Sequence, residues 1–66
     1  MKLKELQDVI ATDLIILDHD TGVKYFNICK TGSLFEGFAD YEVIGIRTYL
    51  KSVIENYLLI SVKKGN

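Results

Sequence analysis

Three consecutive residues, Asp18, His19 and Asp20, bring two carboxylates and the single imidazole of the chain together. Two carboxylates and an imidazole are ligands that suit hard to borderline metal ions. Adjacent residues of a turn point in different directions, however, and no further ligand stands at a recurring spacing. The same residues, followed by Thr21 and Gly22, supply the side-chain bonds and the positive φ of a reversing chain. The sequence therefore predicts a turn at this position and no metal site.

Cys29 is the only cysteine, so a disulfide within one chain is excluded. A nucleophilic cysteine needs a base and a cationic setting, and the only histidine, His19, lies at the far end of the same predicted hairpin. We expect a buried strand cysteine instead. The glycines lack the spacing of a phosphate-binding loop, and no Ser-His-Asp set can be assembled. These patterns predict a non-catalytic protein without a cofactor.

Tyrosines near two cations form the pattern that most favours binding. Tyr and Arg are enriched at the energetic centres of protein interfaces. Aromatic rings beside cations also suit the stacking of a nucleotide or of single-stranded nucleic acid. Against both, Tyr is an ordinary strand residue that covers a sheet edge. The candidate residues for an interface or a nucleotide site are Tyr25, Arg47, Tyr49, Lys51 and Tyr57.

A hairpin must carry the first of these residues, with strands at Leu14–Leu17 and Val23–Cys29. Four consecutive apolar residues in the first strand predict that both of its faces are covered. Alternation in the second strand favours Phe26 and Ile28 as core residues and places Tyr25 at a boundary. An isolated hairpin is marginal in water, so the remaining segments must cover it.

Those segments predict two helices and a second hairpin. Apolar residues recur with helical spacing over Lys2–Ile10, and Ser33 can cap a short helix over Leu34–Phe38. Strands are expected at Tyr41–Tyr49 and at Tyr57–Lys63, and Gly45 in the first of them suggests a bulge or a close backbone approach. Residues 50–56 are open between an extended arm and a helical turn. The expected fold is a single α+β domain over residues 1–66. It has a short N-terminal helix and a four-stranded antiparallel meander that can curl into a half-barrel, with a short helix between the two hairpins.

Size and hydropathy favour self-association. At 66 residues the chain is near the lower limit at which a core holds without help. It is nevertheless 48% hydrophobic, and its mean hydropathy is +0.17. Part of that apolar surface is expected to meet a partner, most simply a second copy in a dimer or a higher homo-oligomer.

Charge and hydropathy also exclude some classes. The net charge of −1 gives no global case for nucleic acid or anionic lipid. Acidic residues gather between Glu5 and Asp20, and basic residues gather between Arg47 and Lys64. These charges either solvate opposite ends of the domain or provide charge complementarity between subunits of an oligomer. No apolar run approaches the ~18 residues of a membrane span, and the N-terminus lacks secretory features. We expect a soluble cytosolic protein.

Short motifs along most of the chain form one pattern: Lys2-Leu3-Lys4-Glu5-Leu6, Val9-Ile10, Leu14–Asp18, Asp20-Thr21-Gly22, Glu42-Val43-Ile44 and Leu58-Leu59-Ile60-Ser61-Val62. This pattern resembles the very short proteins encoded by phages and prophages of low-GC Gram-positive bacteria. The resemblance implies stoichiometric action in the bacterial host cytoplasm. Such proteins block a host defence component, as anti-CRISPR proteins do, or sequester a signalling nucleotide as sponges.

The sequence thus predicts a non-catalytic, oligomeric binding protein that inhibits a host bacterial defence or regulatory protein. One alternative is an oligomer that holds a signalling nucleotide between subunits, using Arg47, Tyr49 and Lys51. A second alternative is a small nucleic-acid-binding module that uses the basic C-terminal half, with binding that weakens steeply in salt.

Overall fold

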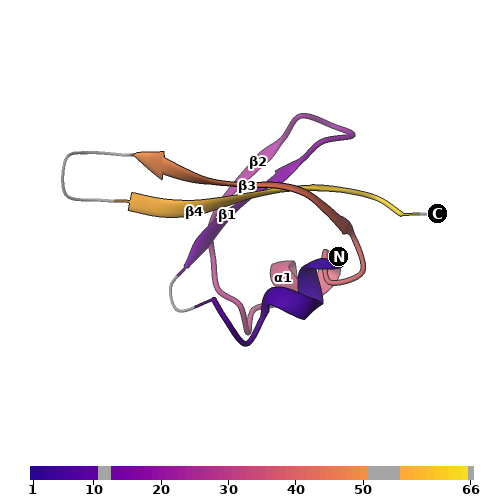
Figure 1. Cartoon of the computed structure of the whole chain (residues 1–66), viewed down its shortest axis with the longest axis horizontal. Coiled ribbons are helices and arrows are strands. Elements are labelled where there is room, and N and C mark those ends of the chain that lie inside the picture. The colour runs from indigo at the N-terminus through magenta and orange to yellow at the C-terminus, as the bar shows by residue number, and fades with distance from the viewer. Residues whose placement is uncertain (11–12, 51–55, 66) are drawn as a thin grey trace.

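Two hairpins joined side by side form the sheet on which the molecule is built (Figure 1). The computed structural model describes residues 1–10, 13–50 and 56–65, and residues 49, 50 and 56 by their backbone only. The elements in chain order are the 3-10 helix η1 (Leu3–Leu6), strands β1 (Leu14–Asp18) and β2 (Lys24–Ile28), helix α1 (Ser33–Gly37), and strands β3 (Glu42–Leu50) and β4 (Asn56–Lys63).

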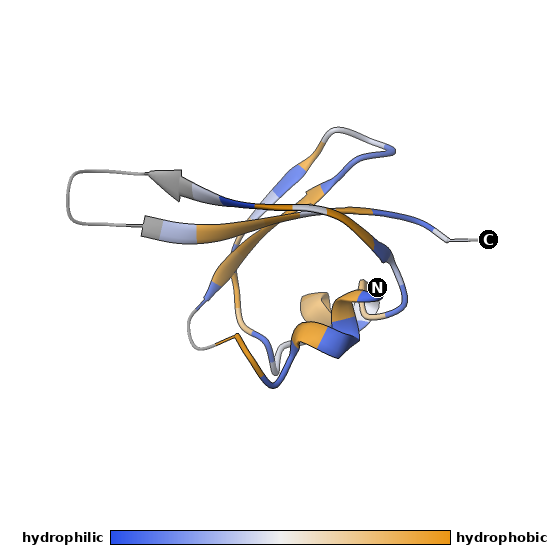
Figure 2. Ribbon diagram, viewed as in Figure 1, coloured by the Kyte–Doolittle hydropathy of each residue, from blue (hydrophilic) through white to orange (hydrophobic). Residues whose placement is uncertain are grey.

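The strand order is β2-β1-β4-β3, with β1 and β4 parallel and the other two pairs antiparallel. The predicted antiparallel meander is therefore wrong. In a meander β1 would be an edge strand, with one side left without a neighbour. The apolar run in β1 instead lies at the centre of the sheet beside β4, and parallel strands are typically buried in this way. Figure 2 shows how strongly the hydrophobic residues concentrate in these two strands.

Both helical segments lie on the same side of the sheet, and the core lies between them and the strands (Figure 1). Phe38 joins the layers through its ring, which lies 5.3 Å from that of Tyr25 and 4.8 Å from that of Tyr41. The opposite face of the sheet has no helix over it among the described residues. The buried core residues are Leu3, Ile10, Leu14, Ile16, Ile28, Phe35, Phe38, Ile60 and Val62.

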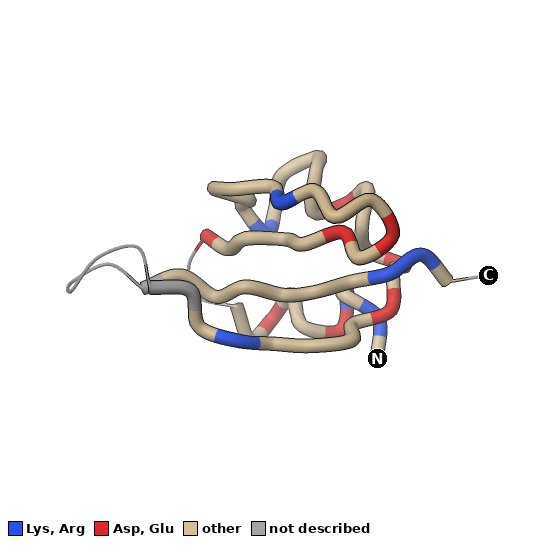
Figure 3. The backbone as a smooth tube through the Cα atoms, turned by 90° about the horizontal axis from the view of Figure 1, so that it is seen from above, with Lys and Arg blue, Asp and Glu red and all other residues tan. Residues whose placement is uncertain are grey.

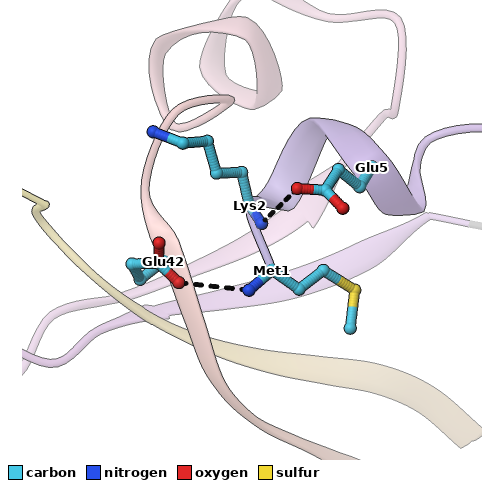
Figure 4. Close-up of polar contacts among 4 residues, drawn as sticks. All are labelled: Met1, Lys2, Glu5 and Glu42. Atoms are coloured by element: carbon cyan, nitrogen blue, oxygen red, sulfur yellow. Dashed lines mark hydrogen bonds and ion pairs between the residues drawn. The ribbon is translucent and has the colours of Figure 1, made fainter.

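The predicted N-terminal helix over Lys2–Ile10 is also wrong, because the helical part is only the 3-10 helix η1. A two-turn helix is marginal on its own, and here the backbone bonds across the fold instead. Lys2 forms an antiparallel bridge with Glu42, and the Leu3 N–H donates to the Tyr41 carbonyl at 3.0 Å. The Met1 ammonium lies 3.2 Å from the Glu42 carboxylate, and the Lys2 N–H donates to the Glu5 carboxylate at 3.1 Å. Figure 4 shows both contacts.

A bulge in β2 changes which side chains reach the core. Leu14 pairs with Ile28 but Ile16 pairs with Tyr25, so Phe26 and Asn27 together lie opposite one residue of β1. Asn27 has a φ of 58°, in the left-handed region. Tyr25 therefore packs against the core beside Ile28, while Phe26 is 51% exposed. The prediction that Phe26 is a core residue is wrong, and that for Ile28 is confirmed.

The second hairpin and the connecting helix are closer to expectation. Val43 pairs with Val62 and Gly45 with Ser61, which leaves Ile44 as an extra residue and confirms the predicted bulge beside Gly45. The short helix is present, beginning one residue earlier than expected. Its N-cap is Gly32 and no side chain caps it, so the predicted capping by Ser33 is wrong.

Candidate binding face

The open face of the sheet can be built from the strand register alone. Leu17 of β1 pairs with Lys24 of β2 and with Ser61 of β4, and Ser61 pairs in turn with Gly45 of β3. Residues directly opposite each other point to the same face. These four therefore form one row that crosses all four strands on the face opposite the helices.

A second row runs beside the first on the same face. Leu59 of β4 pairs with Ile15 of β1 and with Arg47 of β3. Ile15 and Leu59 are buried and lie at the middle of the face, while Arg47 is exposed at its margin. The two rows give the face an apolar centre with cationic side chains toward both edge strands. Figure 3 looks onto this side of the sheet.

A shallow depression of about 440 Å³ lies across the rows. Its hollow follows from the small side chains at its centre, since Gly45 has none and the Ser61 side chain is short. A Cβ placed on Gly45 would lie 3.8 Å from that of Ser61, which is an ordinary contact distance. We call this depression the basic groove. Its lining residues are Leu17, His19, Lys24, Ile44, Gly45, Arg47, Leu59 and Ser61.

The electrostatics of the basic groove are one-sided. Lys24 and Arg47 are exposed, His19 stands between β1 and β2, and none of the eight described lining residues is acidic. The ion pairs Met1–Glu42 and Lys4–Asp40 involve other cations. A ligand that enters the groove thus meets positive charge around an apolar floor, which favours an anionic group attached to an apolar body.

The structure separates the residues that the sequence grouped as a binding site. Arg47 lines the basic groove, and Tyr57 lies two residues from Leu59 on β4, so it shares the open face. Tyr25 lies on the opposite face, against Phe38, so its grouping with Arg47 is wrong. Tyr49 pairs with Tyr57 through the backbone, but its side chain is outside the described part of the structure. Lys51 lies outside the described residues altogether.

Several groove residues were missed by sequence reasoning. Lys24 and Ser61 carry no motif, and they come into line with each other only through the parallel pairing of β1 with β4. His19 was noticed only as a metal-ligand candidate. The signal that could have found them was the four-residue apolar run of β1, which called for a central strand with a neighbour on each side.

The Asp18-His19-Asp20 segment forms the β1–β2 turn. The Asp18 carboxylate is buried and accepts from the Asp20 N–H at 3.0 Å, and the Asp20 carboxylate accepts from the Lys64 N–H at 2.9 Å. Both carboxylates thus serve the backbone, as the turn interpretation requires. In the part of the chain that the structure describes, no group of three His, Cys, Asp or Glu side chains could hold a metal ion.

Cys29 is exposed, which corrects the expectation of a buried cysteine. Cys29 directly follows Ile28, the buried last residue of β2, and successive side chains of an extended chain point to opposite sides. Its sulfur lies 3.2 Å from the Thr31 hydroxyl. A hydrogen bond from Thr31 stabilises the thiolate and lowers the pKa of Cys29 from its ordinary 9.0.

A second depression, of about 250 Å³, lies beside η1 and α1. Polar groups at this place already bond one another. The Gln7 amide donates to the Lys30 carbonyl at 2.8 Å, and the Lys30 ammonium donates to the Ile10 carbonyl at 2.7 Å. These bonds hold the segments together, so the basic groove is the better candidate for a ligand.

No protein-family model, curated protein or solved structure matches this chain. Arguments about its function therefore depend on the geometry of the open face. Within the described ranges, no helix has the length and apolar character needed to cross a bilayer.

Proposed function

We propose that this chain is a non-catalytic binding protein that captures an acidic, amphipathic helix of a partner protein on the open face of its sheet. The observation that carries the proposal is the basic groove, where Lys24 and Arg47 flank an apolar floor without acidic residues. The apolar face of a sheet is buried against another layer, and helices are one of the elements that form such a layer.

The dimensions of the face suit such a helix. Neighbouring strands lie about 4.8 Å apart, so β2 and β3, at the two margins of the sheet, are about 14 Å apart. An α-helix with its side chains is about 10–12 Å wide. An apolar stripe of the helix would lie on Leu17 and Ile44, the accessible apolar residues of the lining, and acids on its flanks would reach Lys24 and Arg47.

The resemblance to small phage proteins adds a class of target to this proposal. Stoichiometric capture of a helix on a host bacterial defence or regulatory protein would block that protein without any catalytic step, in the host cytoplasm. The groove supports capture of an acidic surface, and the resemblance supplies the expectation that the surface belongs to such a target.

Fluorescence anisotropy with a labelled synthetic peptide tests the proposal. The peptide forms a helix with a leucine stripe flanked by glutamates, and its control carries lysines in place of the glutamates. We expect the acidic peptide to bind and the basic one not to bind, with affinity falling as salt rises. Absence of binding by the acidic peptide, or equal binding of the two, would contradict the proposal.

Matched variants locate the binding on the groove. Arg47→Glu reverses a groove cation, and Lys64→Glu makes the same change at an exposed residue outside the groove. Gly45→Leu fills the hollow, and Gly37→Leu makes the same change in α1, where a Cβ meets nothing within 4 Å. We expect the two groove variants to weaken binding by about tenfold or more, which is about 1.4 kcal/mol, and the two controls to bind as wild type.

The volume of the groove favours one second candidate, the sequestration of a signalling nucleotide. About 440 Å³ is within the range of small-molecule sites, and Arg47 with Lys24 could face phosphates. A cyclic dinucleotide that raises the melting temperature of the wild type but not of Arg47→Glu would support this candidate. Unchanged melting temperatures would count against it. The nucleic-acid alternative stays a prediction from the sequence.

A further inference from the structure

The two edges of the sheet are protected to different degrees. The β2 edge is only five residues long and is interrupted by the bulge at Phe26 and Asn27. The β3 edge runs for nine residues, and Met1 covers only its beginning, where the Val43 N–H donates to the Met1 carbonyl at 2.8 Å. Among the described residues no strand pairs with the outer side of positions 44–50. A long edge of this kind is a template for a further strand.

The β3 edge carries exposed apolar side chains that no other part of the described structure covers. Ile46 pairs with Ile60 and so shares its face, yet Ile60 is fully buried and Ile46 is 50% exposed. At Ile46 the core layer therefore ends at β4, and this part of β3 extends its hydrophobic surface beyond the helices, whereas Val43 at the start of the strand still packs against the core. Ile44 is also exposed on the same strand. Natural sheets blunt such an edge with lysines, prolines or a covering element.

We propose that β3 pairs in antiparallel fashion with β3 of a second copy, so that two sheets become one eight-stranded sheet around a two-fold axis. A second copy suits this edge because β3 is compatible with itself in antiparallel register. With the axis at Ile46, each Ile46 meets its own equivalent and each Arg47 stands opposite Gly45 of the second copy. Arg47 is the only charged residue in positions 43–48, so no like charges face each other.

The chain already uses this edge for the same type of pairing. Lys2 forms an antiparallel bridge with Glu42 on the outer side of β3. The same side of β3, further along the strand, suits a second antiparallel strand. The size of the chain gives the pairing a physical benefit, because a 66-residue domain has little core to stabilise it alone.

Pairing around this axis also joins the two binding faces. A two-fold axis perpendicular to a sheet keeps the same face outward in both copies. The basic groove of each copy would then continue across β3 into that of the other, with both Arg47 side chains near the junction. This inference does not depend on what the groove binds, because Ile46 is not among its lining residues.

Native mass spectrometry over a range of protein concentrations tests the pairing. We expect the wild type to be a dimer and Ile46→Lys to be a folded monomer, since a lysine on an edge strand opposes pairing. Val23→Lys is the matched control, because Val23 is 45% exposed and lies outside β3, and it should remain a dimer. A wild type that is monomeric at every concentration would overturn the proposal.

A crosslink provides the second measurement if Ile46→Lys fails to fold. In Cys29→Ser/Ile46→Cys, the dyad places the two new sulfurs on directly opposed residues, whose Cα atoms lie about 4.5–5.5 Å apart. This spacing is within disulfide range, so oxidation should give a covalent dimer. A dimer that neither crosslinks at position 46 nor responds to Ile46→Lys uses another surface and would overturn the proposal. The acidic peptide assay on Ile46→Lys reports separately on the groove.

Discussion

Asn27 determines which side chains of β2 face the core. Its φ of 58° is a conformation that most L residues avoid but that Asn tolerates. Unbroken alternation through Val23–Cys29 would place Phe26 in the core beside Ile28. Nothing in the local pattern marks the bulge except the Asn itself, a residue that is also common in ordinary turns. The shift of Tyr25 to the core could therefore not be predicted.

Substitution of Asn27 tests this account. Asn27→Ala should destabilise the fold by about 1–2 kcal/mol, because Ala carries the steric cost of the left-handed region without the local bonding of Asn. Asn27→Gly should be close to neutral, since Gly adopts positive φ readily. Urea unfolding of both variants measures the difference. Equal stability of the Ala and Gly variants would contradict the assigned conformation.

The Cys29–Thr31 contact predicts a measurable reactivity. Because the Thr31 hydroxyl lowers the pKa of Cys29, more thiolate is present near neutral pH than for an ordinary cysteine. Thr31→Val should slow alkylation by iodoacetamide and move the midpoint of the pH–rate profile upward. Thr48→Val, at an exposed position on β3, should leave both unchanged. An unchanged profile in Thr31→Val would show that the hydrogen bond does not form in solution.

Asp40 gives the fold a small acid dependence. The Lys4 ammonium, 2.9 Å away, lowers the pKa of Asp40 from its ordinary 3.8. A pKa that is lower in the folded than in the unfolded state contributes stability above pH 3.8, which is lost as the pH falls through the folded pKa. Asp40→Asn should thus melt slightly below wild type at neutral pH, and the difference should disappear once the pH is below the folded pKa of Asp40. Both groups are exposed, so salt should shrink the difference. A difference that persists at low pH would contradict the assignment.

At the scale of elements, the four strands and the short connecting helix could be predicted, but their arrangement could not. Alternation of apolar and polar residues and the presence of turn residues are local features of the sequence. They identify a strand whatever its place in the sheet. Strand order depends on which strands bury most surface together, and neighbours in sequence are only usually neighbours in space. The N-terminal segment also depends on distant residues, because its Leu3 and Lys4 N–H groups donate to Tyr41 and Ala39, while a two-turn helix is marginal in itself.

Leu59 distinguishes the mixed sheet from a meander. The alternation of β4 places Leu59 on the face away from the helices, where a solvent-facing residue would be exposed. In the structure Leu59 lies on that face but is only 4% exposed, because β1 and β3 flank it. Leu59→Ala should cost about 2–5 kcal/mol, as for other buried leucines. Ile44→Ala, on the neighbouring strand but exposed, should cost far less. Denaturant unfolding compares the two variants, and equal small losses would favour the meander over the mixed sheet.

At the scale of the whole molecule, one of the groove residues needed for binding could be predicted from the sequence. Arg47 was singled out because Arg is common at interfaces, and it does line the groove. Lys24 and Ser61 are more than thirty residues apart in the chain, and only the parallel pairing puts them in one row with Leu17. A site of this kind has no linear motif, so it can be found only after the strand order is known.

The most direct test of the binding face is a backbone amide NMR titration of the ¹⁵N-labelled protein with the acidic helical peptide. The account predicts chemical-shift changes at Leu17, Lys24, Gly45, Arg47 and Ser61, the residues that form the groove. The amides of η1 and α1, on the other side of the sheet, should remain unchanged. Shifts confined to the helical side, or no shifts at all, would contradict the proposal that the open face is where this protein binds its partner.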